Sequence, residues 1–252
     1  MEEKTIHAEG VVLRTTDFGD AHRVVTIYTK EFGKLDVNAY GCRRPRSKLA
    51  APTLMFNHIG VELLHGAKVD MIRDAELINF FPITDDLLRL AYASLLFEIV
   101  NQMTPLNQKD EDIFFLLINS LRTFVKRNPR VVAVIAACQF IAQSGVLLRL
   151  DRCVRCGSAI DHDCAVDVFE GGALCRRCFD QADNILPLTR NARALVDDMI
   201  AFDWNEQSHI AVRAEPLHDV EKILIAHLQS LIERPLQSLK FLRDIRSMPA
   251  SA

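Results

Sequence analysis

The sequence predicts an α+β protein, in which a five-stranded N-terminal barrel is followed by an α-helical domain with a small cysteine-rich insert. Three observations predict this order. Short segments rich in β-branched residues fill the first 80 residues, apolar residues recur at helical spacing after Pro82, and two Cys-x-x-Cys pairs interrupt the helical part. We therefore expect one domain at residues 1–80 and a second at residues 81–252, with the insert at about residues 150–183.

Five segments of the N-terminal part have the composition and period of strands. They are residues 5–14, 22–29, 34–40, 57–65 and 69–78. In the third segment, Leu35, Val37 and Ala39 alternate with polar residues, which is the period of a half-buried strand. We expect turns at residues 16–20 and 65–68. Five strands in about 75 residues favour a partly open barrel of the oligonucleotide-binding (OB) kind, although a small sandwich or another small barrel has the same pattern.

The period changes to that of helices after Pro82. Thr84 is the expected N-cap of the first helix, because Asp85 and Asp86 then lie in its first turn, where the helix dipole favours negative charge. Further helices are expected at residues 113–125, 129–145, 189–202, 216–232 and 236–245. Because helices stand on both sides of the insert, we expect one helical domain from which the insert protrudes.

The composition excludes disordered, fibrous and membrane-spanning classes. The 252 residues are 49% hydrophobic and 25% charged, as in ordinary globular proteins. The chain begins Met1-Glu2-Glu3-Lys4 with no apolar stretch behind it, which predicts that it has no signal peptide. Its most apolar run, residues 131–142, is shorter than the roughly 20 residues that a membrane span needs. We therefore expect a cytoplasmic protein without a membrane partner.

Four of the seven cysteines have the spacing of a metal site. Cys153 and Cys156 form one Cys-x-x-Cys pair, and eighteen residues separate it from the second pair, Cys175 and Cys178. This is the pattern of a four-cysteine zinc ribbon, and in a reducing cytoplasm such pairs are metal ligands more often than disulfides. Four thiolates leave a tetrahedral ion no open position, so we expect one structural Zn²⁺. The same cysteines could instead be free thiols or hold an iron–sulfur cluster.

A basic loop follows the third predicted strand. It carries four positive charges within six residues, although the whole chain has a formal net charge of −3. These charges belong to Arg43, Arg44, Arg46 and Lys48. Arginine presents a planar fork that suits phosphate, and an exposed ring beside it, for which Tyr40 is the candidate, would let the bases of a single strand stack. The residues that could extend this patch are Arg14, Arg23 and Lys34. The alternative is a solvated loop with ordinary surface charge.

No catalytic motif stands out in the sequence. It contains neither a phosphate-binding Gly-x-x-x-x-Gly-Lys-Ser/Thr loop nor Gly-x-Gly-x-x-Gly, His-Glu-x-x-His or Gly-x-Ser-x-Gly. His7-Ala8-Glu9 matches the His-x-Glu of nucleobase deaminases, but Arg152 stands where their motif has proline, and the second cysteine pair would be unexplained. The sequence therefore favours a binding protein without a small-molecule substrate over an enzyme.

Several segments together carry a resemblance to a known family. They are Gly10-Val-Val-Leu13, Asp17-Phe-Gly-Asp20, residues 24–33, Gly41-Cys-Arg-Arg-Pro-Arg-Ser-Lys48, Leu150-Asp-Arg-Cys-Val-Arg-Cys-Gly157, Gly171-Gly-Ala-Leu-Cys-Arg-Arg-Cys178 and residues 236–245. In this combination, over nearly the whole chain, the sequence resembles the RecO family of bacterial DNA repair and recombination mediators. Some members of that family lack the cysteines, so the zinc prediction depends on the residues of this chain.

The resemblance implies an OB barrel followed by a helical domain, and a function in handling DNA. It implies binding of single- and double-stranded DNA, annealing of complementary strands, and help in loading the recombinase onto strands coated by single-strand-binding protein. The implied partners are DNA, RecR and the acidic, apolar C-terminal tail of single-strand-binding protein, at the bacterial nucleoid. Two other classes stay open, a protein-binding assembly adaptor and a nucleic-acid-processing enzyme in which zinc is a scaffold.

Overall fold

The computed structural model describes residues 5–64, 70–160, 162–179, 185–205 and 207–247. The chain forms two compact units. The first, which we call the barrel unit, comprises Met1–Pro129 and Ser238–Ala252, and the second, the insert unit, comprises Arg130–Gln237. This division differs from the predicted boundary between residues 80 and 81, which stays a prediction.

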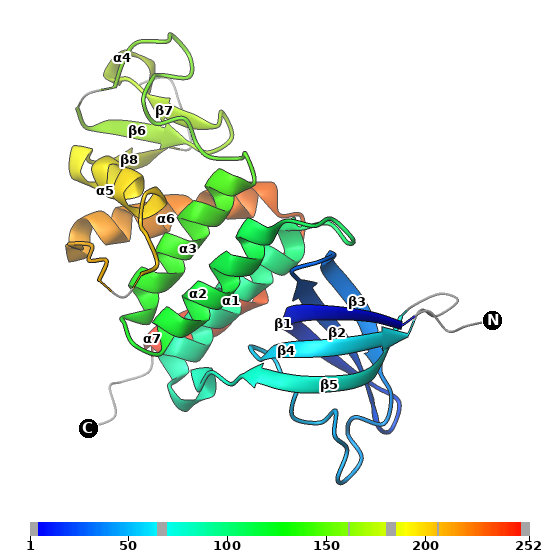
Figure 1. The fold of residues 1–252 in the computed structure, drawn as a ribbon. Coiled ribbons are helices and arrows are strands. Elements are labelled where there is room, and N and C mark those ends of the chain that lie inside the picture. The colour runs from blue at the N-terminus through cyan, green and yellow to red at the C-terminus, as the bar shows by residue number, and fades with distance from the viewer. Residues whose placement is uncertain (1–4, 65–69, 161, 180–184, 206, 248–252) are drawn as a thin grey trace. The chain divides into compact units, whose positions relative to one another are not determined.

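Five strands close the barrel of the barrel unit. They are β1 (Thr5–Phe18), β2 (His22–Thr29), β3 (Gly33–Ala39), β4 (His58–Leu64) and β5 (Met71–Asn79). Their order around the barrel is β1-β2-β3-β5-β4, and β4 pairs again with β1 (Figure 1). The ladders are antiparallel except between β3 and β5, where Asn38 lies opposite Met71 in parallel register. The predicted α+β class with an OB-like barrel is therefore confirmed.

The barrel core follows from the alternation along the strands. On β3 the predicted inward residues Leu35, Val37 and Ala39 are all buried, while Asp36 between them is exposed. The other strands contribute the same kind of β-branched and aliphatic side chains, among them Val12, Val25, Ile27, Ile59, Val61 and Leu63. Successive residues of a strand point to opposite faces, so this alternation places one apolar set inside the barrel.

Two turns were expected between strands of the barrel, and the structure describes only the first of them. The turn expected at residues 16–20 is wrong at its start, because the ladder between β1 and β2 continues until Phe18 lies opposite His22. The turn itself begins at Gly19, whose φ of 54° lies in the left-handed region that glycine adopts at little cost. The turn expected at residues 65–68 lies outside the described residues.

Three α-helices complete the barrel unit: α1 (Leu87–Met103), α2 (Glu111–Phe124) and α7 (Gln237–Ser247). The N-cap of α1 is Asp86, whose carboxylate accepts from the backbone N–H of Arg89 at 2.6 Å. The predicted cap, Thr84, lies instead in the short 3₁₀ turn Ile83–Asp85, so that prediction is wrong. Helix α7 joins α1 because Glu98 accepts from the backbone N–H of Ser238 at 2.8 Å.

The insert unit combines helices with a small sheet. Its elements are α3 (Pro129–Gln143), β6 (Cys164–Asp167), β7 (Gly172–Leu174), α4 (Arg176–Phe179), β8 (Leu186–Leu188), α5 (Arg190–Ile200) and α6 (Ala214–Leu231). The three strands pair in the order β7-β6-β8 (Figure 1). Buried residues of the sheet and of α3, α5 and α6 form one continuous core, so the insert shares its core with the helices around it.

A buried polar side chain ties two helices of this unit together. Gln139 of α3 donates to the backbone carbonyls of Met199, Ile200 and Phe202, at distances of 2.7–3.3 Å, and accepts from the indole N–H of Trp204 at 2.7 Å. The last carbonyls of a helix have no partner within it. Gln139 therefore satisfies the C-terminal end of α5 from a neighbouring helix.

None of the helices in the described part of the chain combines the length and the apolarity that crossing a membrane requires.

Candidate metal centre and nucleic-acid interface

Two short knuckles of the insert present the four predicted metal-ligating cysteines. In the first, the backbone N–H of Gly157 donates to the carbonyl of Cys153 at 2.9 Å, and Gly157 has a φ of 75°. In the second, the backbone N–H of Cys178 donates to the carbonyl of Cys175 at 2.8 Å. Each of these hydrogen bonds closes a tight turn, and such a turn can aim two sulfurs at a single ion.

The β6–β7 hairpin brings the two knuckles together. Cys175 follows the last residue of β7, and the backbone N–H of Val154 donates to the carbonyl of Ala173 on the same strand at 2.9 Å. The first knuckle is thus hydrogen-bonded to the strand that carries the second.

The four sulfur atoms fit a tetrahedral metal ion. The Sγ atoms of Cys153, Cys156, Cys175 and Cys178 all lie within 4.8 Å of one another, and those of Cys156 and Cys175 are 3.6 Å apart. A tetrahedron of sulfurs about 2.3 Å from zinc has edges of about 3.8 Å. The sulfurs are therefore already close to the positions that a bound ion would require.

The charge of four neighbouring thiolates also favours a cation as the ligand of this site. Hydrogen bonds with Ser158 and with neighbouring cysteines lower the pKa of Cys156 to about 6, whereas desolvation and hydrogen bonds to the other cysteines raise the pKa of Cys178 to about 12. Like charges this close disfavour one another, so four thiolates do not form together without a positive ion between them. A divalent metal would supply that charge.

Arg155, although exposed, links the two cysteine knuckles through its guanidinium group. Its Nε lies 3.0 and 2.9 Å from the two carboxylate oxygens of Glu170, and its Nη1 donates to the carbonyl of Cys178 at 3.0 Å. The guanidinium thereby joins the first knuckle to the second knuckle and to the tip of the hairpin. The neighbouring Arg176 and Arg177 are exposed.

The basic loop is an ordered segment attached to the barrel. The backbone N–H of Arg43 donates to the carbonyl of Ala21, in the turn between β1 and β2, at 3.1 Å. Two further turns follow, from Arg44 to Gly41 and from Ser47 to Arg44, each with a hydrogen bond of 3.1 Å. The first of these bonds attaches the loop to the β1–β2 turn at one rim of the barrel, and the other two order the loop internally.

The four predicted cations of this loop are exposed. They are Arg43, Arg44, Arg46 and Lys48. For three of them, Arg44, Arg46 and Lys48, no side-chain hydrogen bond or ion pair occurs among the described residues. Arg46 also has a φ of 66°, which is uncommon for a residue with a side chain. The loop therefore presents charge to solvent that the barrel does not neutralise.

Asp17, which the sequence analysis missed, organises two of the predicted arginines. One of its carboxylate oxygens lies 2.9 Å from Nε of Arg23, and the other lies 3.2 Å from Nε of Arg43. Arg23 also donates to the hydroxyl of Thr53 at 3.5 Å. Arg23 is thus half-buried and engaged within the barrel unit, whereas Arg14 is exposed on β1.

Lys34 does not lie in this patch. Its side chain is only 9% exposed, and its ammonium donates to the backbone carbonyl of Asn101 at 2.5 Å. Burial lowers the pKa of Lys34, against an opposing effect of Asp36. The structure therefore does not support the predicted DNA contact of Lys34, because the group is buried against a backbone acceptor of its own unit.

Tyr40 lies at the same rim and is accompanied by two more rings. It is 49% exposed, and its ring centroid lies 6.1 Å from that of Phe18 and 5.2 Å from that of His22. Phe18 and His22 were not predicted as site residues. Their contact with each other could have been predicted, because both flank the β1–β2 turn. Their proximity to Tyr40 could not, because it depends on the closure of the barrel.

Another face of the barrel is acidic. A groove of about 460 Å³ is lined by residues of β1, β4 and β5 and by Glu31. Its carboxylates belong to Glu9, Glu31, Glu62, Asp74 and Glu76. Charge on the barrel is thus divided between an acidic groove and a basic rim, which the net charge of the chain conceals.

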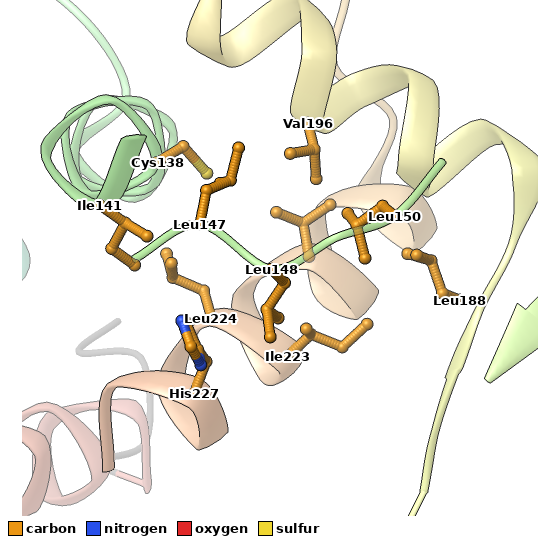
Figure 2. A pocket seen from close by; sticks show the side chains of 11 residues that line it. Cys138, Ile141, Leu147, Leu148, Leu150, Leu188, Val196, Ile223, Leu224 and His227 are labelled. Atoms are coloured by element: carbon orange, nitrogen blue, oxygen red, sulfur yellow. The ribbon is translucent and has the colours of Figure 1, made fainter. Parts of the chain in front are cut away.

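An apolar pocket of about 40 Å³ lies within the insert unit. Figure 2 shows side chains from α3, α5, α6 and the segment 147–150 converging on it, with His227 at one end. The Nε2 of His227 lies 2.7 Å from the carbonyl of Val146, so it carries the proton and donates. Its Nδ1 is buried and has no hydrogen-bond partner in the described chain.

Two family models match the chain in succession. The model described as Recombination protein O N terminal matches residues 1–81, and the one described as Recombination protein O C terminal matches residues 84–240. The two matches together cover the barrel, the basic loop and the four cysteines.

Similar proteins carry the same family name. The chain is 30% identical to the DNA repair protein RecO of Symbiobacterium thermophilum over 247 residues, which are 96% of this chain and 98% of that protein. It is 28% identical to the DNA repair protein RecO of Halalkalibacterium halodurans, with 96% and 95% of the two chains covered. For the Bacillus subtilis protein of the same name the identity is 26%, with 95% and 94% covered. The chain belongs to the RecO family, and its function lies in DNA repair and recombination.

Proposed function

We propose that the chain is a DNA-binding recombination mediator. It binds single- and double-stranded DNA, anneals complementary strands, and helps to load the recombinase onto strands coated by single-strand-binding protein. The observation that carries this proposal is the basic loop, whose unpaired cations stand at a barrel rim beside the exposed ring of Tyr40. Family membership supplies the setting in DNA repair.

The proposed DNA contacts are of two kinds. The contacts to the DNA phosphates come from Arg14, Arg23, Arg43, Arg44, Arg46 and Lys48. Arg23 also has an indirect role, because it holds Asp17, the partner of Arg43, in place. Tyr40 supplies a ring for a base. Backbone contacts carry no sequence information, so binding should tolerate any sequence. The acidic groove repels phosphate and would direct DNA to the basic rim.

Annealing by such a surface needs no chemical step. Two strands must be held with their phosphate charges screened and their bases free to pair. A basic rim does both without nucleotide hydrolysis, so we propose that the protein acts by binding rather than as an enzyme. A DNA-bound mediator of this kind would work at the bacterial nucleoid, in the cytoplasm. We also propose that residues 1–80 and 81–252 are the functional domains.

We propose that the ion of the four-cysteine site is one structural Zn²⁺. Four thiolates favour zinc and leave it no open position for a substrate. Held by Cys153, Cys156, Cys175 and Cys178, zinc would cross-link both knuckles and stabilise the core that the insert shares with α3, α5 and α6.

Salt dependence tests the DNA-binding proposal most directly. Five or six phosphate contacts to a single strand predict that log K falls against log salt concentration with a slope of about −3.5 to −4. We expect this slope with a mixed-sequence single-stranded oligonucleotide, measured by fluorescence anisotropy. Salt-independent or undetectable binding would favour a protein-binding adaptor, and cleavage or deamination of the oligonucleotide would favour an enzyme.

The proposed protein partners are RecR and the C-terminal tail of single-strand-binding protein. The tail is acidic with an apolar end, and we propose that this end enters the apolar pocket of the insert unit. Unfilled space among leucines suits an apolar side chain, and the bare Nδ1 of His227 can accept a hydrogen bond from a peptide N–H.

A charge placed at this pocket should prevent tail binding. Leu147 lines the pocket and is 45% exposed, so Leu147→Asp adds a carboxylate there with little effect on folding. We expect binding of a synthetic tail peptide, measured by calorimetry, to be lost. Leu231→Asp is the matched control, because Leu231 is also exposed, lies in the same unit and does not line the pocket. Equal loss in both variants, or loss in neither, would contradict this location.

A further inference from the structure

We infer that Phe18, His22 and Tyr40 form a stacking site for unpaired bases, so that the barrel unit holds a single strand more tightly than a duplex. We call these three side chains the rim triad. The inference rests on the proposed function, because it assumes that the basic loop carries a nucleic-acid backbone past them. It adds two residues to the proposed interface and states which form of DNA they select.

Three different strands bring the rim triad together. Phe18 ends β1 and lies opposite His22, the first residue of β2, with their ring centroids 5.4 Å apart. Tyr40 follows the last residue of β3, and its ring stands at 80° to that of Phe18 and at 72° to that of His22. These are the edge-to-face arrangements that aromatic rings prefer.

Hydrogen bonds fix two of the rings before any ligand arrives. The backbone N–H of Gly41 donates to Nδ1 of His22 at 2.9 Å, so the neutral imidazole carries its proton on Nε2. The amide of Asn38 donates to the hydroxyl of Tyr40 at 3.3 Å. Side chains that are already ordered lose little conformational entropy on binding, which favours a stacking role.

The charges that bind phosphate lie next to the rim triad. Asp17, the residue before Phe18, pairs with both Arg23 and Arg43. The backbone of Arg43 is in turn hydrogen-bonded to Ala21, the residue before His22. The rings and the guanidinium groups therefore belong to one connected structure. Adjacent charge for the backbone and rings for the bases are the two parts of a single-strand site.

A half-exposed aromatic cluster of this kind discriminates between the forms of DNA. In a duplex, the faces of the bases are covered by their neighbours, and exposing one costs free energy of unstacking. An unpaired base offers its face without that cost. Phosphate contacts alone are available on both forms, so the rim triad should add affinity only for single strands.

The experiment compares three labelled probes of equal length with the full-length protein. They are a thymidine oligonucleotide, the same backbone with abasic sites, and a duplex. Loss of one stacked base lowers affinity roughly tenfold. We expect wild type to bind the thymidine strand roughly tenfold more tightly than the abasic strand. Tyr40→Ala should lose that preference while its affinity for the abasic strand and for the duplex stays unchanged.

Two control variants separate stacking from folding. Tyr40→Phe keeps the ring and removes only the hydroxyl, so it should retain the preference for bases. Phe80→Ala removes an aromatic side chain that is 61% exposed in the same unit, and the ring contacts of the described residues do not include it. It should bind all three probes as wild type does.

The outcomes distinguish this inference from the proposed function. Equal binding of the thymidine and abasic strands by wild type would overturn the inference, and so would an equal loss on all three probes in Tyr40→Ala. If replacement of the loop cations still weakened binding to every probe, the proposed function would stand without the rim triad. If that replacement changed nothing, both would fail.

Discussion

Replacing the four loop cations together by alanine should weaken DNA binding by roughly a hundredfold or more at about 0.1 M salt. The residues are Arg43, Arg44, Arg46 and Lys48. Each cation that neutralises a phosphate releases condensed counterions, and this release is the main source of sequence-independent affinity. The loss should therefore be similar for oligonucleotides of different sequence. The salt slope should become shallower by about 2 to 3, because the counterions are no longer released.

The loop variant should fold normally. Its four side chains are exposed, and the ion pair between Arg43 and Asp17 lies at the surface, where such pairs contribute little to stability. Asp17 keeps its contact with Arg23 in the variant. Thermal unfolding followed by circular dichroism checks that the loss of binding has no folding cause.

A matched control removes the same charge elsewhere. Four exposed cations outside the loop serve this purpose, namely Arg190, Lys222, Lys240 and Arg243. Their replacement by alanine changes the net charge of the chain by the same amount. If both quadruple variants lose affinity equally, the effect is one of overall charge and the loop is not the interface.

Cys153→Ser should remove the metal and loosen the insert. A hydroxyl is a poor substitute for a thiolate in a four-sulfur site, and structural zinc sites contribute folding free energy directly. We expect one zinc per chain in wild type and a clear loss in the variant, measured by elemental analysis. Because Cys153 and Cys175 lie in the core shared with α3, α5 and α6, hydrogen exchange should accelerate across that core.

Cys164→Ser provides the control for this prediction. Cys164 lies in the same insert, is buried and is not one of the four clustered cysteines. The same chemical change there should leave the zinc content unchanged. Removal of zinc from wild type by a chelator should reproduce the loosening seen in Cys153→Ser. Equal zinc in wild type and in Cys153→Ser would refute the site, as would a wild-type protein that binds no metal.

The strands and helices were largely predictable because each depends on a local period. The alternation of Leu35, Val37 and Ala39 specified which face of β3 is buried, and the apolar spacing after Pro82 specified the helices. Errors arose at element ends. Thr84 was the expected cap of α1, but a 3₁₀ turn at Ile83–Asp85 precedes the helix, and the backbone path through that turn makes Asp86 the cap.

The candidate sites were likewise predictable only where they depend on a local sequence pattern. By itself, the sequence determined the cysteine cluster and the position of the basic loop, because two-residue spacing closes a knuckle and a run of cations stays together whatever the fold. Only the tertiary structure decided that Lys34 is buried against Asn101, that Asp17 joins Arg23 to Arg43, and that Phe18 and His22 meet Tyr40. These contacts depend on strand register and on barrel closure, which bring together residues that no local pattern connects.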